Sequence, residues 1–361
     1  MDDERWTLDV CFQIVTSPKD VRAFRRFLLR WFRRHGRDLP WRKTRDPYAI
    51  LVSEFMLQQT QVATVIPYYN KWLRRFPDFA SVARASQNDV LHGWQGLGYY
   101  NRARNLHAAS KIVQDQHMGI FPGDIAVIRK LPGIGRYTAN AVATFAFHQP
   151  VPIVETNTAR LLARLFDMRA PIDSAIGREK LWESAAQVVP SRNAARFNSA
   201  LIDLGALVCL ADRPKCNVCP VKKFCRAKNP EALPIKKSRP RTKRLIETHA
   251  FVTNNGRVLL EQSSARWHGM WILPPLKLDG LRPSSSRQRP AYKFVFPFTH
   301  HRVTLRIFHQ RPPKIDNRSQ RWFSIRRIES VPIPSPHRRA IVDLLSARPA
   351  TRSHRRRSSE R

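Results

Sequence analysis

Four cysteines that fall within seventeen residues constrain the fold of this chain more than any other feature. They are Cys209, Cys216, Cys219 and Cys225, a C-x6-C-x2-C-x5-C run. Such a compact set is poorly suited to disulfide pairing, whereas four thiolates can enclose one soft metal centre. Zinc sites usually show two C-x2-C pairs, and here only the middle pair has that spacing. The run also differs from both ferredoxin patterns, so we expect a metal-binding loop, with zinc or an iron–sulfur cluster as its occupant.

The charge balance points to a polyanionic partner. The 361 residues include 64 Lys and Arg against 27 Asp and Glu, a formal net charge of +37. Nucleic acid is favoured, because phosphate neutralisation releases counterions and supplies affinity without sequence specificity. A membrane partner is not expected, since no apolar run reaches about 18 residues and residues 1–10 lack the regions of a secretory signal. Only Cys11 lies outside the cysteine run, so we expect no disulfide framework and a cytoplasmic protein at the nucleoid.

Hydrophobic spacing divides the chain into a helical part and a strand-rich part. Apolar residues recur at helical intervals up to the last cysteine, with Gly and Pro between the segments. Short apolar runs around Asn254-Asn255-Gly256 then predict a β-hairpin, and residues 338–347 predict a closing helix. We expect an N-terminal extension (1–20), a helical region (21–228), a basic Pro-rich linker (229–246), a smaller α+β domain (247–347) and a disordered basic tail (348–361).

The string Leu131-Pro132-Gly133-Ile134-Gly135 lies between two segments of helical character. Gly133 and Gly135 allow the backbone to turn tightly and leave free amides at the start of the second helix. Such amides, together with the helix dipole, form a phosphate-binding site. The string therefore predicts a helix-hairpin-helix that grips a DNA backbone, with a simple connecting turn as the alternative.

Two carboxylates suit the removal of a base from DNA. Such an enzyme flips the base out of the duplex, and it needs an acid for the leaving group and a negative charge beside the sugar. Glu54 lies in an apolar helix with Gln58 at i+4 and Gln61 at i+7, so desolvation would raise its pKa toward neutrality. Glu155 precedes another helix, whose dipole would keep it ionised. The alternatives are a solvated or paired Glu54 and a Glu155 that only caps its helix.

These motifs together resemble the MutY type of adenine DNA glycosylase, which removes adenine opposite 8-oxoguanine. The resemblance covers roughly residues 30–345 and rests on RDLPWR, SEFMLQQTQV, LPGIG, GLGYY, the cysteine run and the FTH string near residue 300. It implies two helical lobes with a [4Fe-4S] loop at 209–225, followed by an α+β domain of Nudix-like fold. It also implies a monomer that binds double-stranded DNA with 8-oxoguanine:A or G:A mispairs.

The same resemblance implies roles for the matching residues. Glu54 would be the general acid, Gln59 would insert into the base stack, and Tyr99 would intercalate beside 8-oxoguanine. The implied site comprises catalytic Glu54, Tyr137, Glu155 and Asn157; substrate-binding Arg37, Arg42, Leu57, Gln59 and Tyr99; DNA-binding Gly133, Gly135, Phe298, Thr299 and His300; and the cluster ligands Cys209, Cys216, Cys219 and Cys225.

Two positions and one domain depart from related patterns. The MutY pattern has Asp where this chain has Glu155, which moves the carboxylate by one methylene. The bifunctional endonuclease III branch has a nucleophilic lysine where this chain has Tyr137, so we expect a monofunctional enzyme without strand cleavage. Residues 275–300 contain one acidic group, Asp279, too few to hold Mg2+ for Nudix hydrolysis. A mismatch thymine or uracil glycosylase, or a catalytically weak lesion-binding protein, remains the alternative.

Overall fold

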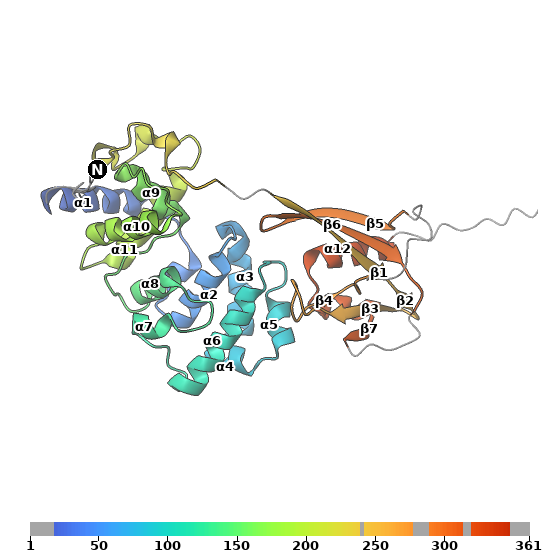
Figure 1. Cartoon of the computed structure of the whole chain (residues 1–361). Coiled ribbons are helices and arrows are strands. Elements are labelled where there is room, and N and C mark those ends of the chain that lie inside the picture. The colour runs from blue at the N-terminus through green and yellow to red at the C-terminus, as the bar shows by residue number, and fades with distance from the viewer. Residues whose placement is uncertain (1–17, 239–241, 277–288, 313–318, 347–361) are drawn as a thin grey trace, which may run out of the picture. The chain divides into compact units, whose positions relative to one another are not determined.

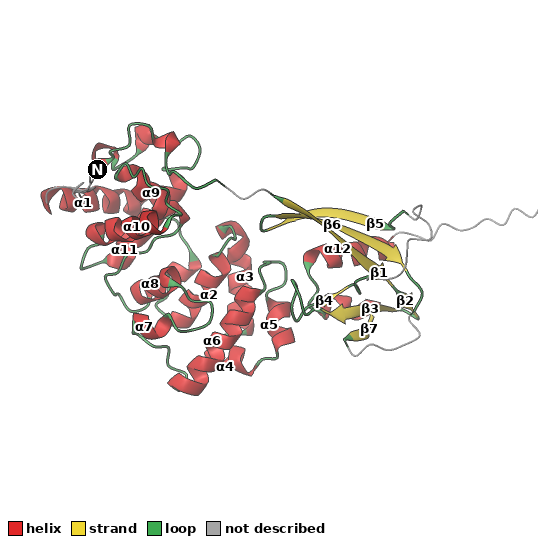
Figure 2. Cartoon of the chain, viewed as in Figure 1, coloured by secondary structure: helices red, strands yellow, loops and turns green. Residues whose placement is uncertain are grey.

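The computed structural model describes residues 18–238, 242–276, 289–312 and 319–346. The chain divides into two compact units, each considered by itself: unit 1 (residues 1–84 and 105–239) and unit 2 (residues 85–104 and 240–361). Figures 1 and 2 show helices throughout unit 1 and strands concentrated in the C-terminal part of unit 2. A helical region followed by a smaller α+β region is thereby confirmed. Among the described residues, no helix has the length and apolar character needed to cross a bilayer.

Unit 1 is built from α-helices and short 3-10 turns around buried apolar side chains. Its elements are α1 (Pro18–His35), η1 (Pro40–Arg42), α2 (Pro47–Leu57), α3 (Val62–Arg75), α4 (Phe79–Arg84), most of α6 (Asn101–His117), α7 (Ile125–Ile128), α8 (Arg136–Phe145), α9 (Thr156–Leu165), α10 (Ala175–Val188), α11 (Ala194–Leu207), η2 (Cys216–Val218), η3 (Lys222–Phe224) and η4 (Pro230–Ala232). One core joins Phe24 and Leu28 of α1 to Leu162 of α9 and to Phe197 and Leu201 of α11.

Helix α2 is buried on all sides, because every residue from Tyr48 to Met56 is buried. Pro47 occupies its first turn, and the Asp46 carboxylate accepts hydrogen bonds from the amides of Tyr48 and Ala49. The helix ends at Leu57, and Gln59 has a φ of 57°. The helical spacing that the sequence predicts from Glu54 to Gln58 and Gln61 is therefore wrong. Gln58 is the C-cap and Gln61 the N-cap of α3, so neither continues the helix of Glu54.

Helices α9 and α11 approach so closely that only glycine fits at position 205. A Cβ built on Gly205 would lie 2.7 Å from the carbonyl oxygen and 2.8 Å from the Cβ of Asn157. Real Cβ atoms do not approach backbone at such distances, so the contact fixes the first turn of α9 against α11.

The chain after the cysteine run stays hydrogen-bonded to the helices of unit 1 as far as Ile235. The Leu233 carbonyl accepts a hydrogen bond of 3.0 Å from the buried guanidinium of Arg164, and the Ile235 carbonyl accepts one from the Ile172 amide. Strand β1 begins at Lys243, inside the stretch that the composition assigned to a linker.

Unit 2 contains two sheets, a C-terminal helix and a short helix from the middle of the chain. Its elements are α5 (Gln87–Gly93), the start of α6, β1 (Lys243–Phe251), β2 (Thr253–Asn254), β3 (Arg257–Gln262), β4 (Trp271–Ile272), β5 (Tyr292–Phe298), β6 (His301–His309), β7 (Gln320–Ser324), η5 (Ile325–Ser330) and α12 (Ser335–Ser346). One sheet has the order β1-β6-β5, with β1 parallel to β6, and the other joins β2, β4 and β7 to β3.

Two local predictions for unit 2 are confirmed. Strands β2 and β3 pair antiparallel across Asn255 and Gly256, which both have positive φ (45° and 70°), as the Asn-Gly signal requires. The closing helix is α12, and its buried Ala340 and Ile341 share a core with Val303 and Leu305 of β6.

Candidate active site

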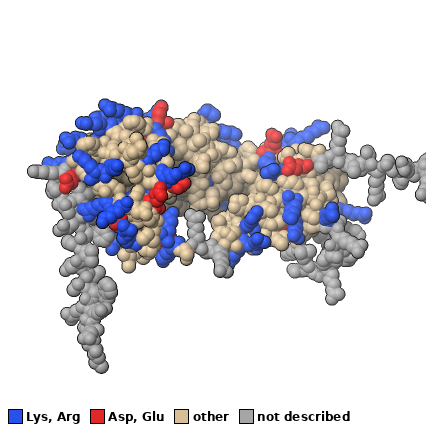
Figure 3. All heavy atoms as spheres, turned by 90° about the horizontal axis from the view of Figure 1, so that it is seen from above, with Lys and Arg blue, Asp and Glu red and all other residues tan. Residues whose placement is uncertain are grey.

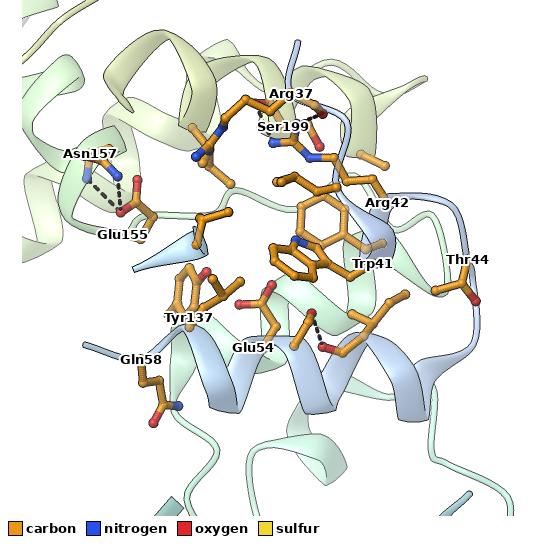
Figure 4. Close-up of a pocket in the computed structure, with 18 of the residues that line it drawn as sticks. Arg37, Trp41, Arg42, Thr44, Glu54, Gln58, Tyr137, Glu155, Asn157 and Ser199 are labelled. Atoms are coloured by element: carbon orange, nitrogen blue, oxygen red, sulfur yellow. Dashed lines mark hydrogen bonds between the residues drawn. The ribbon is translucent and has the colours of Figure 1, made fainter. Parts of the chain in front are cut away.

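A cavity of about 810 Å³ in unit 1 brings together all the predicted catalytic and substrate-binding residues except Tyr99. It is lined by the segment after α1, by α2 and the loop after it, by the starts of α8 and α9, and by α11. The predicted residues among its lining are Arg37, Arg42, Glu54, Leu57, Gln59, Tyr137, Glu155 and Asn157. Figure 4 shows Glu54 and Tyr137 side by side at one wall, with Arg37 and Arg42 opposite and Glu155 beside Asn157.

Glu54 is a buried carboxyl with a strongly perturbed pKa. Its side chain is 4% exposed, and Oε2 has no hydrogen-bond partner among the described residues. Burial raises the pKa of Glu54 to about 7, while a hydrogen bond from the Tyr137 hydroxyl opposes part of that rise and the charge of Glu155 adds to it. Burial and the neighbouring Glu54 carboxylate raise the pKa of Tyr137 far above its ordinary value. Near neutral pH, Glu54 can therefore be protonated and donate a proton, as the sequence predicts.

Replacement of Glu54 by Gln should stabilise the protein at about pH 8. The pKa rises from 4.5 in the unfolded chain to about 7 in the folded protein, so the native state binds the extra proton between these values. This contribution to stability is complete below about pH 4.5 and is lost as the pH rises through about 7. At about 1.4 kcal/mol per unit of pKa shift, the total loss of stability is about 3 to 4 kcal/mol. Calorimetry should give a higher Tm for Glu54→Gln than for wild type at about pH 8, and a smaller difference at about pH 5. An equal Tm difference at both pH values would contradict the assigned pKa.

Glu155 is the N-cap of α9, so the capping interpretation of this residue holds. Its Oε2 accepts a hydrogen bond of 2.8 Å from the Asn157 amide, and its Oε1 accepts one of 2.8 Å from the Thr158 amide. The Thr158 hydroxyl in turn accepts from the Glu155 amide at 2.7 Å, which completes a capping box. Burial raises the pKa of Glu155, and the two amides oppose that rise. The Glu155 carboxylate also lines the cavity, so the capping hydrogen bonds hold it at the cavity wall.

A chain of hydrogen bonds runs from Glu155 to the cysteine run. Asn157 donates from Nδ2 to Glu155 at 3.2 Å and accepts at Oδ1 from Arg160 Nη2 at 2.9 Å. Arg160 also donates from Nε to the Cys209 carbonyl at 2.8 Å. Both ends of the Asn157 amide are thus occupied by protein groups, and Arg160 joins the first turn of α9 to the start of the cysteine run. Sequence reasoning missed Arg160, whose only local signal is a cation on an apolar helix face.

Arg37 and Arg42 share one buried partner, Asp203 of α11. Arg37 donates to the carboxylate from its amide and its Nε, both at 2.8 Å, and Arg42 donates from Nη1 at 2.8 Å and Nη2 at 2.9 Å. The side chain of Asp203 is fully inaccessible, and its pKa is lowered because these hydrogen bonds and charges outweigh its burial. The two arginines line the cavity but are held by Asp203. Sequence reasoning missed this carboxylate, although an Asp in the apolar run ALIDLGAL was an available signal.

The predicted hairpin forms between α7 and α8. Gly133 has a φ of 74°, and a Cβ there would lie 2.5 Å from Nδ2 of Asn105, so another residue would have to displace this side chain. Gly135 is the N-cap of α8, and a Cβ at this position would meet no atom within 4 Å. Ile134 between them is buried. The exposed glycine backbone at the start of α8 fits the predicted phosphate contact.

The four cysteines line one pocket of about 280 Å³. The Cys209 Sγ accepts a hydrogen bond of 3.4 Å from Arg164 Nη1, and burial raises the pKa of Cys219 to about 11. Among the described residues, no three His, Cys, Asp or Glu side chains are grouped closely enough for a single metal ion. The pocket nevertheless collects four sulfur donors around one space, which is the donor set of an iron–sulfur cluster. Cys11 lies outside the described residues.

In unit 2, Tyr99 is an exposed aromatic residue presented by a strained loop. It has a φ of 47° and is 43% exposed, and it follows Gly96 and Gly98, which also have positive φ. The guanidinium of Arg102 lies 5.5 Å from the Tyr99 ring centroid and donates to the carbonyls of Leu97 and Gly98 at 3.1 Å. A buried cation therefore supports this loop, and sequence reasoning missed it.

The predicted FTH string forms the turn between β5 and β6. Thr299 has a φ of 52° and, like His300, is exposed, whereas Phe298 is half-buried. The Phe298 ring contacts Trp267 at a centroid distance of 5.4 Å and lies 4.6 Å from the Arg266 guanidinium. Thr299 and His300 are thus the members of the string that face solvent, while Phe298 packs partly into unit 2.

Comparison with known proteins relates this geometry to one family. Residues 52–187 match HhH-GPD, described as "HhH-GPD superfamily base excision DNA repair protein". The chain is 30% identical over 332 residues to the adenine DNA glycosylase of Buchnera aphidicola subsp. Acyrthosiphon pisum, covering 87% of this chain and 95% of that one. It is 43% identical over 226 residues to the adenine DNA glycosylase of Homo sapiens, covering 60% of this chain and 41% of that one.

Two solved structures each cover 58% of this chain. A thermostable thymine-DNA glycosylase is 30% identical with a TM-score of 0.53, covering 58% of this chain and 96% of that one. A non-covalent endonuclease III–DNA complex is 24% identical with a TM-score of 0.51 and shows a shared fold. The Buchnera relative is matched over almost its whole length. The chain therefore belongs to the adenine DNA glycosylase family of the MutY type.

Proposed function

We propose that this protein is a monofunctional DNA glycosylase that excises adenine mispaired with 8-oxoguanine or guanine, at the chromosome and in base excision repair. The observation that carries the proposal is the buried Glu54 carboxyl, whose pKa is about 7, in a cavity that also holds Tyr137 and Glu155. A flipped base needs such a closed space, and its departure needs a proton near neutral pH.

In this mechanism Glu54 gives its proton to the adenine ring and so makes the base a better leaving group. The Tyr137 hydroxyl, hydrogen-bonded to Glu54, orients the carboxyl and stabilises the carboxylate once the proton has left. The same carboxylate can then accept a proton from the water that attacks the sugar. The sugar carbon becomes cationic as the C–N bond breaks, and the Glu155 carboxylate supplies the opposing charge from the end of α9.

We expect no strand cleavage, and the cavity lining supports this expectation. A lyase reaction needs an amine that forms a Schiff base with the sugar. No lysine is among the described residues that line the cavity, and Tyr137 stands where the bifunctional branch has its lysine. The product should therefore be an intact abasic strand.

Specificity for 8-oxoguanine is assigned to exposed groups of unit 2. Tyr99 and the turn at Thr299 and His300 present aromatic and polar side chains to solvent. An exposed aromatic residue can enter a base stack, and neighbouring polar groups can read base edges. The half-buried Phe298 would act mainly by supporting that turn.

We further propose that Cys209, Cys216, Cys219 and Cys225 hold a [4Fe-4S] cluster. When bound, the cluster supplies rigidity and charge to this loop and no chemistry to base release. The donors from Arg164 and Arg160 to Cys209 would then connect a rigid loop to α9, and Arg160 would extend the connection to Asn157 in its first turn.

Loss of one thiolate should remove the cluster and weaken the site at a distance. For purified Cys216→Ser we expect a drop in iron content and visible absorption, a lower Tm and weaker duplex binding, since metal binding contributes directly to folding. Elemental analysis checks the metal. One zinc atom per chain in the wild-type protein would contradict the proposal, because it would show that the four cysteines form a zinc site.

The cap at Glu155 predicts which substitutions are tolerated. Asp is a favoured N-cap residue, so Glu155→Asp should keep the hydrogen bonds to the amides of Asn157 and Thr158 and retain base release. Glu155→Gln keeps the size but removes the charge, and we expect its single-turnover rate to fall at least about 100-fold, with about 1 kcal/mol lost from the cap. Equal rates for wild type and Glu155→Gln would restrict Glu155 to capping.

The proposed function is tested by single-turnover base release on duplexes with 8-oxoguanine:A, G:A, T:G and U:G, each with and without alkali. Breaks in the adenine strand that need alkali would support a monofunctional adenine glycosylase. Release of thymine or uracil would favour the second candidate function, a mismatch thymine or uracil glycosylase. The 30% identity to a thymine-DNA glycosylase supports this candidate. Tight binding of 8-oxoguanine:A without any release would identify a lesion-binding protein.

A further inference from the structure

Helix α1 carries a row of exposed arginines on one face. We call Arg22, Arg26, Arg30, Arg33 and Arg34 the basic stripe; all five are exposed. From Arg22 to Arg33 the spacing of three or four residues places them along the helix one above another, and Arg34 adjoins Arg33. The opposite face carries the buried Phe24, Leu28 and Trp31. The only acidic residue of α1 is Asp20 in the first turn.

The basic stripe is held rigidly. Arg25, on the flank of the helix, donates from Nε to the Val188 carbonyl at 2.8 Å and from Nη2 to the Val189 carbonyl at 2.9 Å, which ties α1 to the end of α10. Phe24 packs edge-on against Phe197 of α11 with centroids 6.2 Å apart. The arginines therefore project from a fixed helix, and a rigid partner can bind them with little loss of backbone entropy.

The loop that carries the cysteines packs against the same helix. The Lys223 ammonium lies 4.1 Å from the Phe27 ring centroid, and the Phe224 ring packs edge-on against Phe24 at 5.8 Å. The exposed cations of this loop are Arg213, Lys215, Lys222, Lys223, Arg226 and Lys228. Figure 3, which looks onto the upper side of Figure 1, shows Lys and Arg gathered over unit 1 with few acidic residues between them.

We propose that the basic stripe binds the phosphate backbone of duplex DNA that flanks the lesion, as an extension of the DNA-binding surface. From Arg22 to Arg33 the helix rises about 16 Å at 1.5 Å per residue. One DNA strand presents a phosphate about every 3.4 Å of axis, so the stripe matches about five phosphates. None of its arginines lines the cavity, so the contact provides affinity and leaves the chemical step unchanged. The inference rests on the proposed function in that the partner is lesion-bearing DNA.

The test compares wild type with a triple variant, Arg26→Gln, Arg30→Gln and Arg33→Gln. The matched control carries Lys71→Gln, Arg74→Gln and Arg84→Gln, three exposed cations of α3 and α4. Duplex affinity is measured from low to moderate salt on 8-oxoguanine:A duplexes of about 12 and about 40 base pairs. The slope of log K against log salt is negative, and each lost phosphate contact reduces its magnitude by about 0.9. On the long duplex, the slope of the triple variant should therefore be smaller in magnitude than that of wild type by about 2 to 3. On the short duplex, and in the control, the slope should stay near that of wild type.

Single-turnover base release at saturating enzyme separates this inference from the proposed function. Unchanged release with a reduced slope on the long duplex would support the stripe as a DNA contact. An unchanged slope, an equal loss in the control, or an equal loss on both duplexes would overturn it while release continued. If the triple variant lost affinity for single-stranded RNA but kept its affinity for duplex DNA, the inference would also be overturned, because the stripe would then bind a different polyanion. Absence of release in wild type would count against the proposed function, whatever the slopes.

Discussion

Glu54→Gln is expected to bind lesion duplexes as wild type does and to release adenine at least about 1,000-fold more slowly, within the range by which a positioned acid accelerates a reaction. Gln has almost the size of Glu, so the buried side chain of α2 keeps its packing and the Tyr137 hydroxyl keeps a neighbouring oxygen. The variant lacks the acidic proton that Glu54, with a pKa of about 7, can donate to the base. Quenched single-turnover kinetics measure the rate, and gel shift or fluorescence anisotropy measures binding.

The control for this variant is Glu183→Gln on the exposed side of α10. It removes the same charge from the same unit but changes no cavity residue, so its rate should equal that of wild type. Release by Glu54→Gln at the control's rate would show that another group protonates the base. A parallel loss of binding and release would show that Glu54 holds the cavity together and is not its acid.

Asp203→Asn is expected to destabilise the protein by about 3 to 5 kcal/mol, the cost of leaving buried charges without their partner. Arg37 and Arg42 would keep their positive charges while losing the carboxylate that accepts four hydrogen bonds from them. For a unit of this size, Tm should fall by roughly 10 °C. Calorimetry measures the shift, and base release should also fall because both arginines line the cavity.

Asp212→Asn provides the comparison for that variant. Asp212 pairs with Arg213 at 3.7 Å, but both side chains are almost fully exposed, and exposed pairs contribute little. Its Tm should stay within about 2 °C of wild type. If the two variants shifted Tm equally, burial of the Asp203 carboxylate could not be the source of the effect.

Features set by neighbouring residues could be predicted from the sequence. The Asn255-Gly256 turn and the glycine hairpin at 133–135 depend on backbone conformations that few residues adopt, so a short string is sufficient. Glu54 could be identified because one carboxyl in an apolar run must be desolvated wherever that helix is buried.

Features set by distant residues could not be predicted in this way. Arg37 and Arg42 depend on Asp203, more than 160 positions away, and nothing near the arginines indicates that partner. The helical period likewise continued through Gln58 and Gln61, although the chain turns at Gln59 and starts a new helix at Val62. Glu155 shows an intermediate case, since its cap could be anticipated locally but its place in the cavity depends on how α9 meets α11.

Position 205 shows that a residue without any functional group can control the reaction. Gly205 is not among the residues that line the cavity, yet any side chain there would push against Asn157, two residues from Glu155. A methyl group at this position would move the start of α9, and an error of about 1 Å in a reacting group can cost about 100-fold in rate. A collection of random inactive variants should therefore include substitutions of Gly205 beside those of the acids. If such variants were classified only by the functional group that they change, those at Gly205 would be misclassified as unrelated to catalysis.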